Sequence, residues 1–542
     1  MHNRAVDART IRHRFYTAAQ LRELDRLAIE AGIPGFDLMQ RAASALFRQL
    51  LEHWPATREL LVLAGGGNNG GDGYVLAGLA AEHRIRARVF HLAEPDTLKG
   101  EAAEALEFAR ARDVEIKAFD ASGFSSALSQ SPTGHALIVD AMLGTGVSGS
   151  LRAPYDEAVN LVNAAGLPVL SVDVPSGLIS DTGGIAGDAV CADLTVTFIG
   201  MKQGLYTGLG PDYSGQIQFE TLGVDLSVYA SEQVDPPASS VLDIQSVLPL
   251  LPVRKPSTHK GQCGNVLIVG GDRGFGGAVL MAAEAAARAG AGTVSLLTRE
   301  EHVAPMLARR PEVMVRATDA RVAEDPEAAK AALEPLLDKA SVLLLGPGMG
   351  QGPWSRLLLA AALMAHEERG LPLVLDADAL VLLARAGTVS GGPPVADSRL
   401  QQENCIITPH PGEAARLLGL DAEAVQGDRF AAVLQLQQRW SRYSMLKGSG
   451  SLVCTPGPDE RPHIEICTEG NPGMASGGMG DVLAGLVAGL LAQGLGLADS
   501  LRCAVAVHGE SADLAAAETG PRGLLATDLL PHCQQLLNRS PS

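Results

Sequence analysis

Basic residues are scarce in this sequence relative to acidic ones. Only 43 Lys and Arg stand against 61 Asp and Glu, which gives the chain a formal net charge of −18. A charge of this sign disfavours a general binder of nucleic acids or of anionic membranes, since both need a basic surface. An anionic ligand would have to be held by local backbone N–H groups and a few lysines.

Aromatic residues are also few, at 4% of the chain, whereas glycine numbers 61. Packing through small residues with many glycine turns is typical of α/β nucleotide-binding folds. Hydrophobic residues make up 46% of the chain, which is ample for packed interiors and argues against disorder.

Cysteines never occur at the CxxC spacing of zinc sites and redox motifs, and their number is odd. Several of them lie in apolar runs. We therefore expect free, buried thiols in a reducing compartment, with neither a disulfide framework nor a zinc site. The seven are Cys191, Cys263, Cys405, Cys454, Cys467, Cys503 and Cys533.

Signals for export or for a membrane span are missing too. Residues 1–14 are basic and polar and lack an apolar core. The longest apolar stretch, DVLAGLVAGLLAQGLGLA, begins at Asp481 with a charge and contains several glycines, so it predicts a buried core helix. We expect a cytoplasmic protein that binds neither nucleic acid nor membrane.

The length of 542 residues is too great for a single core and predicts two domains. A change to a Pro- and Ser-rich texture around residues 231–258 marks the junction between them. We expect a short N-terminal tail over 1–14, a first domain over 15–230, a linker over 231–244 and a second domain over 245–540.

Short apolar runs that end in glycine motifs alternate with helical patterns in both domains. The first domain opens with helical patterns over 17–32 and 38–53, and its strands are expected at 61–65, 136–144, 168–177 and 193–200. The second domain has strands expected at 265–272, 293–298, 341–348, 371–380, 404–413 and 444–454, and helices at 478–494 and 498–518. This alternation predicts two three-layer α/β domains with parallel sheets covered on both faces, the first of them Rossmann-like.

A glycine-rich string, GGGNNGGDG, occupies positions 65–73 directly after the first strand. Glycines let the backbone turn tightly and approach a phosphate, and the start of the following helix offers free N–H groups. A plain strand-to-helix turn is the alternative, but the paired Asn and the Asp favour phosphate or ion binding. The string is not the GxGxxG fingerprint, so it does not indicate a hydride-transferring Rossmann enzyme.

Two further polar motifs follow later strands of the first domain. They are VDAMLGTG at 139–146, which contains Asp140, and VDVPSG at 172–177, which contains Asp173 and Ser176. In an open parallel sheet, ligands bind outside the carboxyl ends of the strands. One Asp at a strand end can be a helix cap, but three polar motifs at three strand ends predict a shared site.

These three strings, in this order, resemble those of the YjeF N-terminal family of NAD(P)H-hydrate epimerases over residues 15–225. The resemblance implies a potassium ion bound by Asn69, Asp140 and Ser176, a donor set that suits a hard cation. It also implies that Asp173 is a candidate general acid/base. The hydrated cofactor would contact Asn68, Asn69, Gly70, Gly71, Asp72, Gly144, Thr145, Gly146, Val147, Ser148, Gly149, Ser150 and Asp173.

Three points qualify this resemblance. Lys202 could hold the substrate's phosphates or assist proton transfer, or it could be a solvated surface lysine. Gln40 stands where relatives often have Glu, a departure that touches no catalytic position. The same domain also occurs in scaffold proteins of RNA metabolism, but the intact acidic residues Asp72, Asp140 and Asp173 favour an enzyme.

The second domain contains the most specific string in the chain, GNPGMASGGMGD at 470–481, which opens the apolar helix. Glycines at a helix start create a nest of N–H donors for anionic oxygens. Asp481, held beside such a nest, could take a proton from a substrate hydroxyl. An ordinary helix cap is the alternative, but a cap does not need this many glycines.

The string resembles the GxGD helix start of ribokinase-like kinases and, more narrowly, the YjeF C-terminal family of ADP-dependent NAD(P)H-hydrate dehydratases over residues 245–540. HKG at 259–261, GPGMG at 346–350 and TPHPGE at 408–413 agree with it, although relatives often have Leu at the position of Met349. A ribokinase-like three-layer α/β/α domain is implied. So are hydrate contacts through Ala278, Gly348, His410 and Asp481, and nucleotide contacts through Lys447, Gly448, Ser449, Gly450, Ser451 and Gly480.

Some residues near these motifs keep two interpretations. His410, between two prolines, could be a structural histidine or a site residue, and the site is favoured. Asp376 and Asp378 could be caps at a strand end or site carboxylates, with Asp376 the better candidate.

Together the two resemblances imply a bifunctional enzyme for small-molecule substrates. It would epimerise hydrated NADH and NADPH and then dehydrate the S form with ADP as co-substrate, with magnesium expected as a phosphate partner and a homo-oligomer as the assembly. A vitamin-precursor kinase fused to a non-catalytic binding domain is one alternative, and a non-enzymatic scaffold is another.

Overall fold

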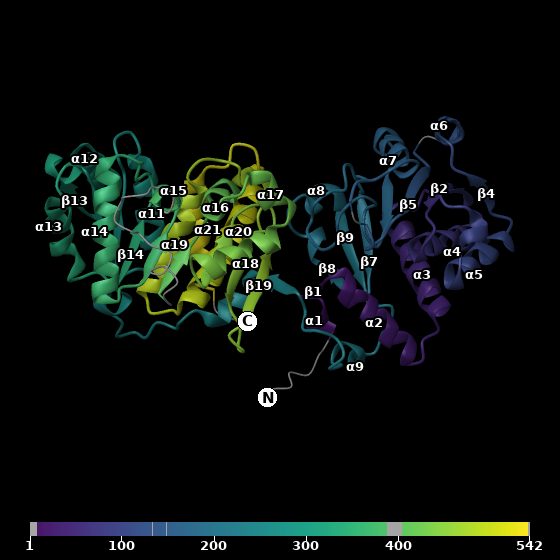
Figure 1. Cartoon of the computed structure of the whole chain (residues 1–542), viewed down its shortest axis with the longest axis horizontal. Coiled ribbons are helices and arrows are strands. Elements are labelled where there is room, and N and C mark those ends of the chain that lie inside the picture. Colours follow the sequence, from purple (N-terminus) through teal and green to yellow (C-terminus); the bar gives the residue numbers. More distant parts are fainter. Residues whose placement is uncertain (1–7, 133, 148, 387–403, 540–542) are drawn as a thin grey trace. The chain divides into compact units, whose positions relative to one another are not determined.

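Two sheets organise the fold, one formed by strands of the N-terminal half of the chain and one formed mainly by strands of the C-terminal half (Figure 1). The computed structural model describes residues 8–132, 134–147, 149–386 and 404–539. They divide into an N-terminal unit, Met1–Ser240, and a C-terminal unit, Val241–Ser542. Each unit combines a parallel sheet with helices, which confirms the predicted α/β class.

The sheet of the N-terminal unit is parallel throughout, in the order β4-β3-β2-β5-β6-β7-β9. Its central strands are buried on both faces, as the continuous apolar run ELLVLA of β2 requires. The strands are β2 (Glu59–Ala64), β3 (Arg86–His91), β4 (Glu115–Ala118), β5 (Ala136–Ala141), β6 (Val169–Val172), β7 (Leu194–Phe198) and β9 (Gln216–Glu220).

Helices cover both faces of this sheet. Leu61 and Leu63 of β2 pack with Phe124 of α6 and Val159 of α7, while α3, α4 and α5 pack together as a separate group. The helices are α1 (Ala8–Ile11), α2 (Ala18–Glu30), α3 (Gly35–His53), α4 (Asn68–Glu82), α5 (Gly100–Arg110), α6 (Ala121–Gln130), α7 (Tyr155–Ala164), α8 (Gly210–Ser214) and α9 (Leu226–Tyr229). The result is the three-layer arrangement that the sequence predicts.

A short pairing beside this sheet positions Lys202. Strand β1 (Arg14–Tyr16) runs parallel to β8 (Met201–Lys202), with Tyr16 opposite Lys202, and antiparallel to the start of β10 (Ser239–Leu242). The next helix, α2, begins in a capping box, in which the Gln20 N–H donates to the Thr17 hydroxyl and the Thr17 N–H donates to the Gln20 side chain.

The sheet of the C-terminal unit runs in the order β13-β12-β11-β14-β15-β16-β17-β18-β19. Its strands are parallel from β13 to β17, and β18 and β19 continue antiparallel. The strands are β11 (Asn265–Val269), β12 (Thr293–Arg299), β13 (Met314–Thr318), β14 (Val342–Leu345), β15 (Leu373–Leu375), β16 (Cys405–Ile407), β17 (Tyr443–Leu446), β18 (Leu452–Pro456) and β19 (Pro462–Cys467).

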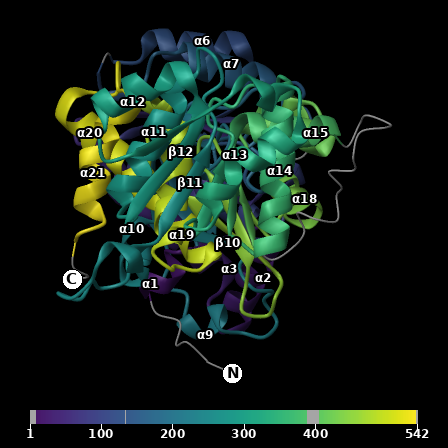
Figure 2. The same cartoon turned by 90° about the vertical axis from the view of Figure 1, so that its left-hand side faces the viewer.

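Figure 2 shows strands β11 and β12 with α20 and α21 on one side and α14 on the other. The group formed by α11, α19, α20 and α21 packs together, and so does the pair formed by α13 and α14. The helices are α10 (Ile244–Val247), α11 (Gly276–Ala289), α12 (Val303–Arg309), α13 (Pro326–Leu337), α14 (Pro353–Arg369), α15 (Ala377–Ala386), α16 (Pro411–Leu418), α17 (Ala422–Gly427), α18 (Arg429–Arg439), α19 (Met479–Ala492), α20 (Leu497–Thr519) and α21 (Leu529–Leu536).

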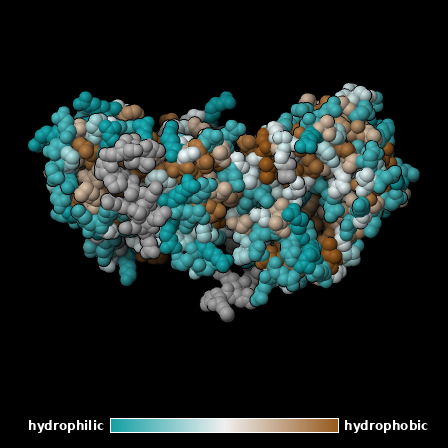
Figure 3. Space-filling model, in the orientation of Figure 1, coloured by the Kyte–Doolittle hydropathy of each residue, from teal (hydrophilic) through white to brown (hydrophobic). Residues whose placement is uncertain are grey.

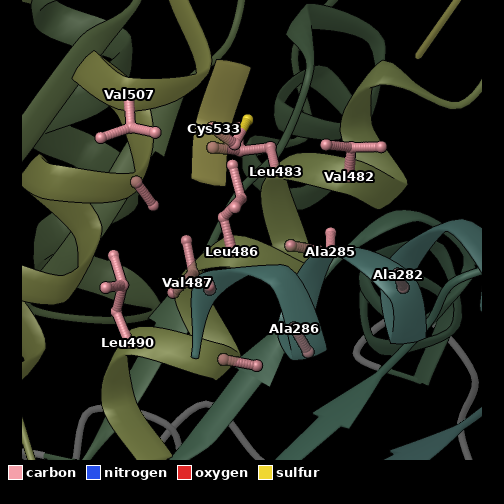
Figure 4. Packing of buried hydrophobic residues seen from close by; sticks show 14 of the residues in the cluster. Ala282, Ala285, Ala286, Val482, Leu483, Leu486, Val487, Leu490, Val507 and Cys533 are labelled. Carbon is pink, nitrogen blue, oxygen red and sulfur yellow. The ribbon is translucent and has the colours of Figure 1, made fainter. Parts of the chain in front are cut away.

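Helix α19 packs against α11 in the core of this unit (Figure 4). A Cβ added to Gly485 would lie 2.2 Å from the Ala282 carbonyl oxygen, so the two backbones approach more closely than larger residues allow. The apolar stretch after Asp481 is thus a buried core helix, as predicted. In the part of the chain described above, no helix has the length and apolar character that a membrane span requires.

Several strand predictions are confirmed in place but differ in length. At 371–380 and 404–413 only the first residues form strands, because helices α15 and α16 begin within those ranges. Strands β3, β4, β9, β13 and β19 were not predicted, since polar residues interrupt the apolar run in each of them. The single strand predicted at 444–454 is wrong: the range contains the end of β17 and the start of β18, which pair antiparallel across the loop between them. Hydrophilic residues cover much of the face in Figure 3, with smaller hydrophobic areas between them.

Candidate functional site

The glycine-rich string of the N-terminal unit forms the tight turn from β2 into α4. A Cβ on Gly65 would lie 1.8 Å from the Met142 carbonyl oxygen, and one on Gly70 would lie 2.1 Å from the Gly65 carbonyl oxygen. Only glycine fits at these close approaches. Asn68, Asn69, Gly70, Gly71 and Asp72 consequently form the first turns of α4, at the carboxyl end of β2.

Asp140, in strand β5, is fully buried and is surrounded by hydrogen-bond donors. Its Oδ1 accepts from the Ser176 hydroxyl at 2.5 Å, and its Oδ2 accepts from the Ser176 N–H at 2.8 Å and the Ser171 hydroxyl at 2.9 Å. Burial raises the pKa of Asp140, while the hydrogen bonds from Ser176 and Ser171 oppose that rise. The structure thus joins Asp140 to Ser176, as the sequence predicts.

Asn69 lies against the loop that follows β5. A Cβ on Gly144 would be 3.5 Å from the Asn69 Cγ, and the buried Asn69 Nδ2 has no hydrogen-bond partner among the described residues. The predicted contact residues Gly144, Thr145, Gly146, Val147, Gly149 and Ser150 belong to this loop, and Ser148 lies outside the described residues. An orphaned amide beside a polar loop is a position where a ligand or ion would find a partner.

Asp173 directly follows β6 and adopts a left-handed backbone conformation, with φ of 67°. Its Oδ1 accepts hydrogen bonds from the Phe198 N–H at 3.1 Å, the Thr197 hydroxyl at 3.2 Å and the Lys202 ammonium. Lys202 is only 2% exposed, which excludes the solvated surface lysine. A non-glycine residue with positive φ costs free energy and is held here by these contacts.

Two more carboxylates face the Asp173–Lys202 pair. Burial raises the pKa of Asp72 well above its ordinary value, and the charges of Asp173 and Asp25 add to the rise. Asp25, on α2, was not singled out from the sequence, since it is one charge among many on an amphipathic helix. Surrounding protein raises its pKa to about 6, Lys202 opposes this and Asp173 adds to it.

In the C-terminal unit, the carboxyl ends of four neighbouring parallel strands, β14 to β17, carry predicted motifs. Asp376 follows β15 and Lys447 follows β17, and their side chains form an ion pair at 2.5 Å with Asp376 almost fully buried. The Thr408 hydroxyl, after β16, also donates to Asp376, at 2.8 Å. Asp376 thus lies within this cluster, paired with Lys447, whereas Asp378 accepts the Gly350 N–H at 2.8 Å and fixes that loop.

Asp481 lies in the first turn of α19, beside this pair. A Cβ on Gly480 would be 3.0 Å from the Lys447 Nζ, so the missing side chain lets the ammonium approach the helix start. Burial raises the pKa of Asp481 to about 7, Asp376 adds to this shift and Lys447 opposes it. Within the described residues its carboxylate makes no hydrogen bond, which leaves it available to a substrate hydroxyl.

His410 and Glu413 form the start of α16 next to the same cluster. His410 Nδ1 accepts the Gly412 N–H at 3.0 Å, and Glu413 Oε2 accepts the His410 N–H at 2.9 Å. Burial raises the pKa of Glu413 to about 7, with Lys447 opposing and Asp376 adding to it. His410 thus serves as a helix cap, and its exposed ring remains accessible.

The remaining predicted hydrate contacts meet at the start of α11. A Cβ on Gly348 would lie 3.0 Å from the Ala278 Cβ and 2.9 Å from the Phe275 Cβ. Phe275, which precedes α11 and is 57% exposed, was not identified from the sequence. An exposed aromatic ring beside Gly348 offers a stacking surface.

The loop Lys447–Ser451 is built over a buried arginine. Arg429, with no solvent exposure, donates to the carbonyl oxygens of Leu446 at 3.2 Å, Lys447 at 3.3 Å and Gly450 at 3.5 Å. A Cβ on Gly448 would lie 2.8 Å from the Arg429 Nη1. This arginine lies eighteen positions before the loop in the sequence, and no motif marks it.

Comparison with known proteins follows the same division of the chain. Residues 35–204 match the family described as YjeF-related protein N-terminus, and residues 266–535 match the family described as NAD(P)H-hydrate dehydratase. A bifunctional NAD(P)H-hydrate repair enzyme from Coxiella burnetii is 45% identical over 523 residues, which are 96% of this chain and 99% of that protein.

The chain belongs to the bifunctional NAD(P)H-hydrate repair enzyme family.

The repair-enzyme family also includes the Escherichia coli protein of the same description, 39% identical over 98% of this chain and 95% of that protein. A solved ribokinase-like superfamily protein from Enterococcus faecalis is 29% identical and covers 54% of this chain and 93% of its own, with a TM-score of 0.46. The two matched family regions contain all the site residues above except Asp25, which precedes the first region.

Proposed function

We propose that this chain repairs hydrated NADH and NADPH: its N-terminal unit interconverts the R and S epimers of the hydrate, and its C-terminal unit dehydrates the S epimer with ADP. Identity to bifunctional repair enzymes along nearly the whole chain is the observation that carries this proposal. Both halves keep the acidic side chains that such chemistry needs.

For the epimerase half, Asp173 is the proposed general acid/base. Its hydrogen bonds from Thr197 and Phe198 and its pairing with Lys202 fix the carboxylate at the end of β6. The proposed hydrate contacts are the first turns of α4, the loop after β5 and Asp173 itself. Lys202, already paired, is proposed to assist the proton transfer at Asp173 and to neutralise charge in a cluster of carboxylates.

Potassium is the proposed metal of this half. The donors would be Asn69, Asp140 and Ser176. The Asn69 Nδ2 position is buried and without a partner among the described residues, and it fits such an ion because a flip of the amide would place the oxygen there. When bound, the ion would supply positive charge near the buried Asp140. The residues themselves orient one another through the Ser176–Asp140 hydrogen bonds.

For the dehydratase half, Asp481 is the proposed general base. It would take the proton of the hydrate's hydroxyl, whose oxygen then accepts a phosphoryl group from ADP, releasing AMP. The new phosphate ester is a better leaving group than hydroxide. The ring nitrogen expels it as inorganic phosphate, and loss of a proton from the neighbouring ring carbon restores the dihydronicotinamide.

The other contacts are proposed from the resemblance to the dehydratase family. Ala278, Gly348 and His410 would meet the hydrate, and Gly480 with the loop from Lys447 to Ser451 would meet ADP. Lys447, paired with Asp376, supports this role because a cation beside the helix start attracts a phosphoryl group. Magnesium is proposed as a partner of the ADP phosphates, with no protein ligands assigned.

Two proposals concern the whole protein. A cytoplasmic location is supported by seven free cysteines, six of them buried, which suit a reducing compartment. A homo-oligomer is also proposed, and analytical ultracentrifugation of the purified chain tests it.

The deciding assay incubates a mixture of both hydrate epimers with ADP and follows the return of dihydronicotinamide absorbance. Complete recovery is expected, since epimerisation supplies the S form as it is consumed. Recovery that stops when the S epimer is exhausted would contradict the epimerase half, and no recovery would contradict the proposed dehydratase. A vitamin-precursor kinase would instead consume ATP without restoring the absorbance.

A further inference from the structure

A cavity of about 580 Å³ lies in the C-terminal unit at the end of α11 and α19 that is remote from Asp481. Ala289 and Gly290 of its lining are at the end of α11, and Leu490 and Gln493 are at the end of α19, whereas Asp481 begins α19. Nine residues of helix separate Asp481 from Leu490, or about 14 Å at 1.5 Å per residue. The cavity is therefore distinct from the proposed catalytic site.

Positive charge is concentrated in this cavity. Four arginines line it, Arg254, Arg288, Arg310 and Arg539, against two glutamates, Glu284 and Glu312, so the lining carries an excess of two positive charges. The whole chain, by contrast, has a net charge of −18. A locally basic cavity in an acidic protein attracts small anions.

One of the two glutamates of the cavity, Glu284, is paired with arginines. Glu284, 4% exposed, is paired with Arg310, and Arg309 lies 3.8 Å from it. The carbonyl end of α11 is also satisfied, since Arg254 donates to the Gly290 oxygen at 2.5 Å and Gln493 to the Ala289 oxygen at 2.8 Å. These contacts reduce the negative charge that an anion would meet, and Glu312 is the remaining carboxylate of the lining.

Two guanidinium groups of the lining, those of Arg254 and Arg288, bind only neutral groups: Arg254 donates to the Gly290 oxygen and to the Gln493 side chain, and Arg288 donates to the Gln534 side chain at 2.5 Å. Arg539 is exposed and forms no salt bridge among the described residues, although its charge acts on Glu510. A guanidinium presents a fork of donors that matches phosphate oxygens. The same lining contains the apolar side chains of Leu251, Pro252 and Val253, the last of them 87% exposed, and the amide of Asn538.

We propose that this cavity is a second ligand site, which binds a nucleotide carrying a di- or triphosphate. The arginines would hold the phosphates, and the apolar wall with its amides would hold the base. The volume lies within the range of small-molecule pockets. The helices α11 and α19, packed along their length, connect this cavity to Ala278 and Asp481 at their other ends (Figure 4).

Isothermal titration of the full chain with ADP, without hydrate, tests the proposal. Two binding events are expected, one at each end of α19. The double variant R288A/R539A should weaken one event at least tenfold, because two charge-assisted contacts are lost, and higher salt should weaken the same event in the unaltered chain. Inorganic pyrophosphate should bind this site more weakly than ADP, since it has no base.

The matched control is R321A/R461A, which removes two arginines that are 79% and 80% exposed and lie outside the cavity. It should retain both events. ADP binding that R288A/R539A leaves unchanged, whether as one event or two, would overturn the proposal. Equal affinity for pyrophosphate and ADP would overturn the nucleotide as the occupant.

This experiment is independent of the proposed function. R288A/R539A should dehydrate the hydrate at the unaltered rate in the absorbance assay. A chain that restores dihydronicotinamide but whose ADP binding is unchanged in R288A/R539A contradicts the cavity proposal alone. A chain that binds ADP twice but leaves the hydrate unchanged contradicts the proposed function alone.

Discussion

Asp481 combines the properties that a general base requires near neutral pH. Its carboxylate is partly accessible and makes no hydrogen bond within the described residues, and its pKa is raised to about 7. A base with a pKa near the working pH combines a sufficient deprotonated fraction with a strong pull on the proton. Burial in the glycine-rich start of α19 provides this shift.

Asp481→Asn should remove the base while keeping the size of the side chain. We expect dehydration to fall about 100- to 1000-fold, the usual cost of losing such a group. Epimer interconversion, followed by chromatography, should be unchanged. The matched control Asp338→Asn changes an aspartate that is 73% exposed on its side chain and should retain both activities. A D481N enzyme with normal dehydration would contradict the proposed role.

The rate of dehydration should depend on pH through the same carboxylate. Only the deprotonated form accepts a proton, and its pKa is raised to about 7, so kcat/KM should rise with pH up to about 7 and fall about tenfold per unit below it. Asp376→Asn should move the rising part of this pH profile to lower pH. Asp376 raises the pKa of Asp481, and Lys447, freed from its partner, would lower it further. A pH profile that stays in place or moves to higher pH in this variant would contradict the proposed effect of Asp376 on the pKa of Asp481.

Among single residues, the sequence predicts those that lie within glycine-rich or polar motifs. It misses those whose role depends on a partner distant in the sequence. Asp140, Ser176 and Asp481 were identified from strings of glycine and polar residues. Asp376 stayed ambiguous because its partner Lys447 is 71 residues away, and only the strand order makes them neighbours. Asp25 has no local signal at all.

The loop Lys447–Ser451 depends, as an element, on the arginine beneath it. Arg429 donates hydrogen bonds to three carbonyl oxygens of the segment Leu446–Gly450. Carbonyls drawn inward leave the N–H groups of a glycine-rich loop free for an anion. Burial lowers the pKa of this guanidinium to about 10, so it remains charged near neutral pH under the proposed nucleotide site.

Arg429→Met should therefore raise the KM for ADP at least tenfold while kcat falls less, because the loop loses its support but Asp481 remains. Arg429→Lys keeps the charge without the fork of donors and should recover only part of the affinity. The control Arg439→Met changes an exposed arginine of the same helix. A variant with a lowered kcat and an unchanged KM would show that Arg429 does not act on nucleotide binding.

The proposed potassium site joins the start of α4 to the end of β5. An ion that binds only the folded protein raises its stability, by about 1.4 kcal/mol at ten times the Kd. Thermal unfolding in potassium chloride should therefore occur at a higher temperature than in choline chloride of equal ionic strength. Asn69→Ala should abolish the difference, and Gln130→Ala, at the exposed end of α6, should keep it. Equal melting temperatures in both salts would count against the site.

The type of each element was predicted well where the apolar pattern is strong. The ends of short strands were predicted poorly. Strand β15 has three residues, because Asp376 must turn toward Lys447 and α15 begins at once. The mostly apolar sequence of residues 371–380 does not show where the strand ends and the helix begins. Boundaries between a strand and the following helix depend on tertiary contacts, which cannot be read from the local sequence.

At the scale of the whole molecule, the two proposed activities share a substrate but no residue. The epimerase cluster around Asp173 lies in the N-terminal unit, and the dehydratase cluster around Asp481 lies in the C-terminal unit. A dehydratase shaped for one epimer would leave the other unrepaired. An epimerase in the same chain removes that limit, since the hydrate released by one unit is the substrate of the other.

Full-length variants that each lack one activity test this independence. Asp173→Asn alone should restore dihydronicotinamide only up to the S share of the starting mixture, because its dehydratase is intact and its epimerase is not. Asp481→Asn alone should restore none, yet equilibrate the epimers. A mixture of the two variants should reach complete recovery, since the hydrate diffuses between them. Recovery that remains at the S share in the mixture would mean that the two active sites must belong to the same chain, and the units could then not be regarded as separate enzymes.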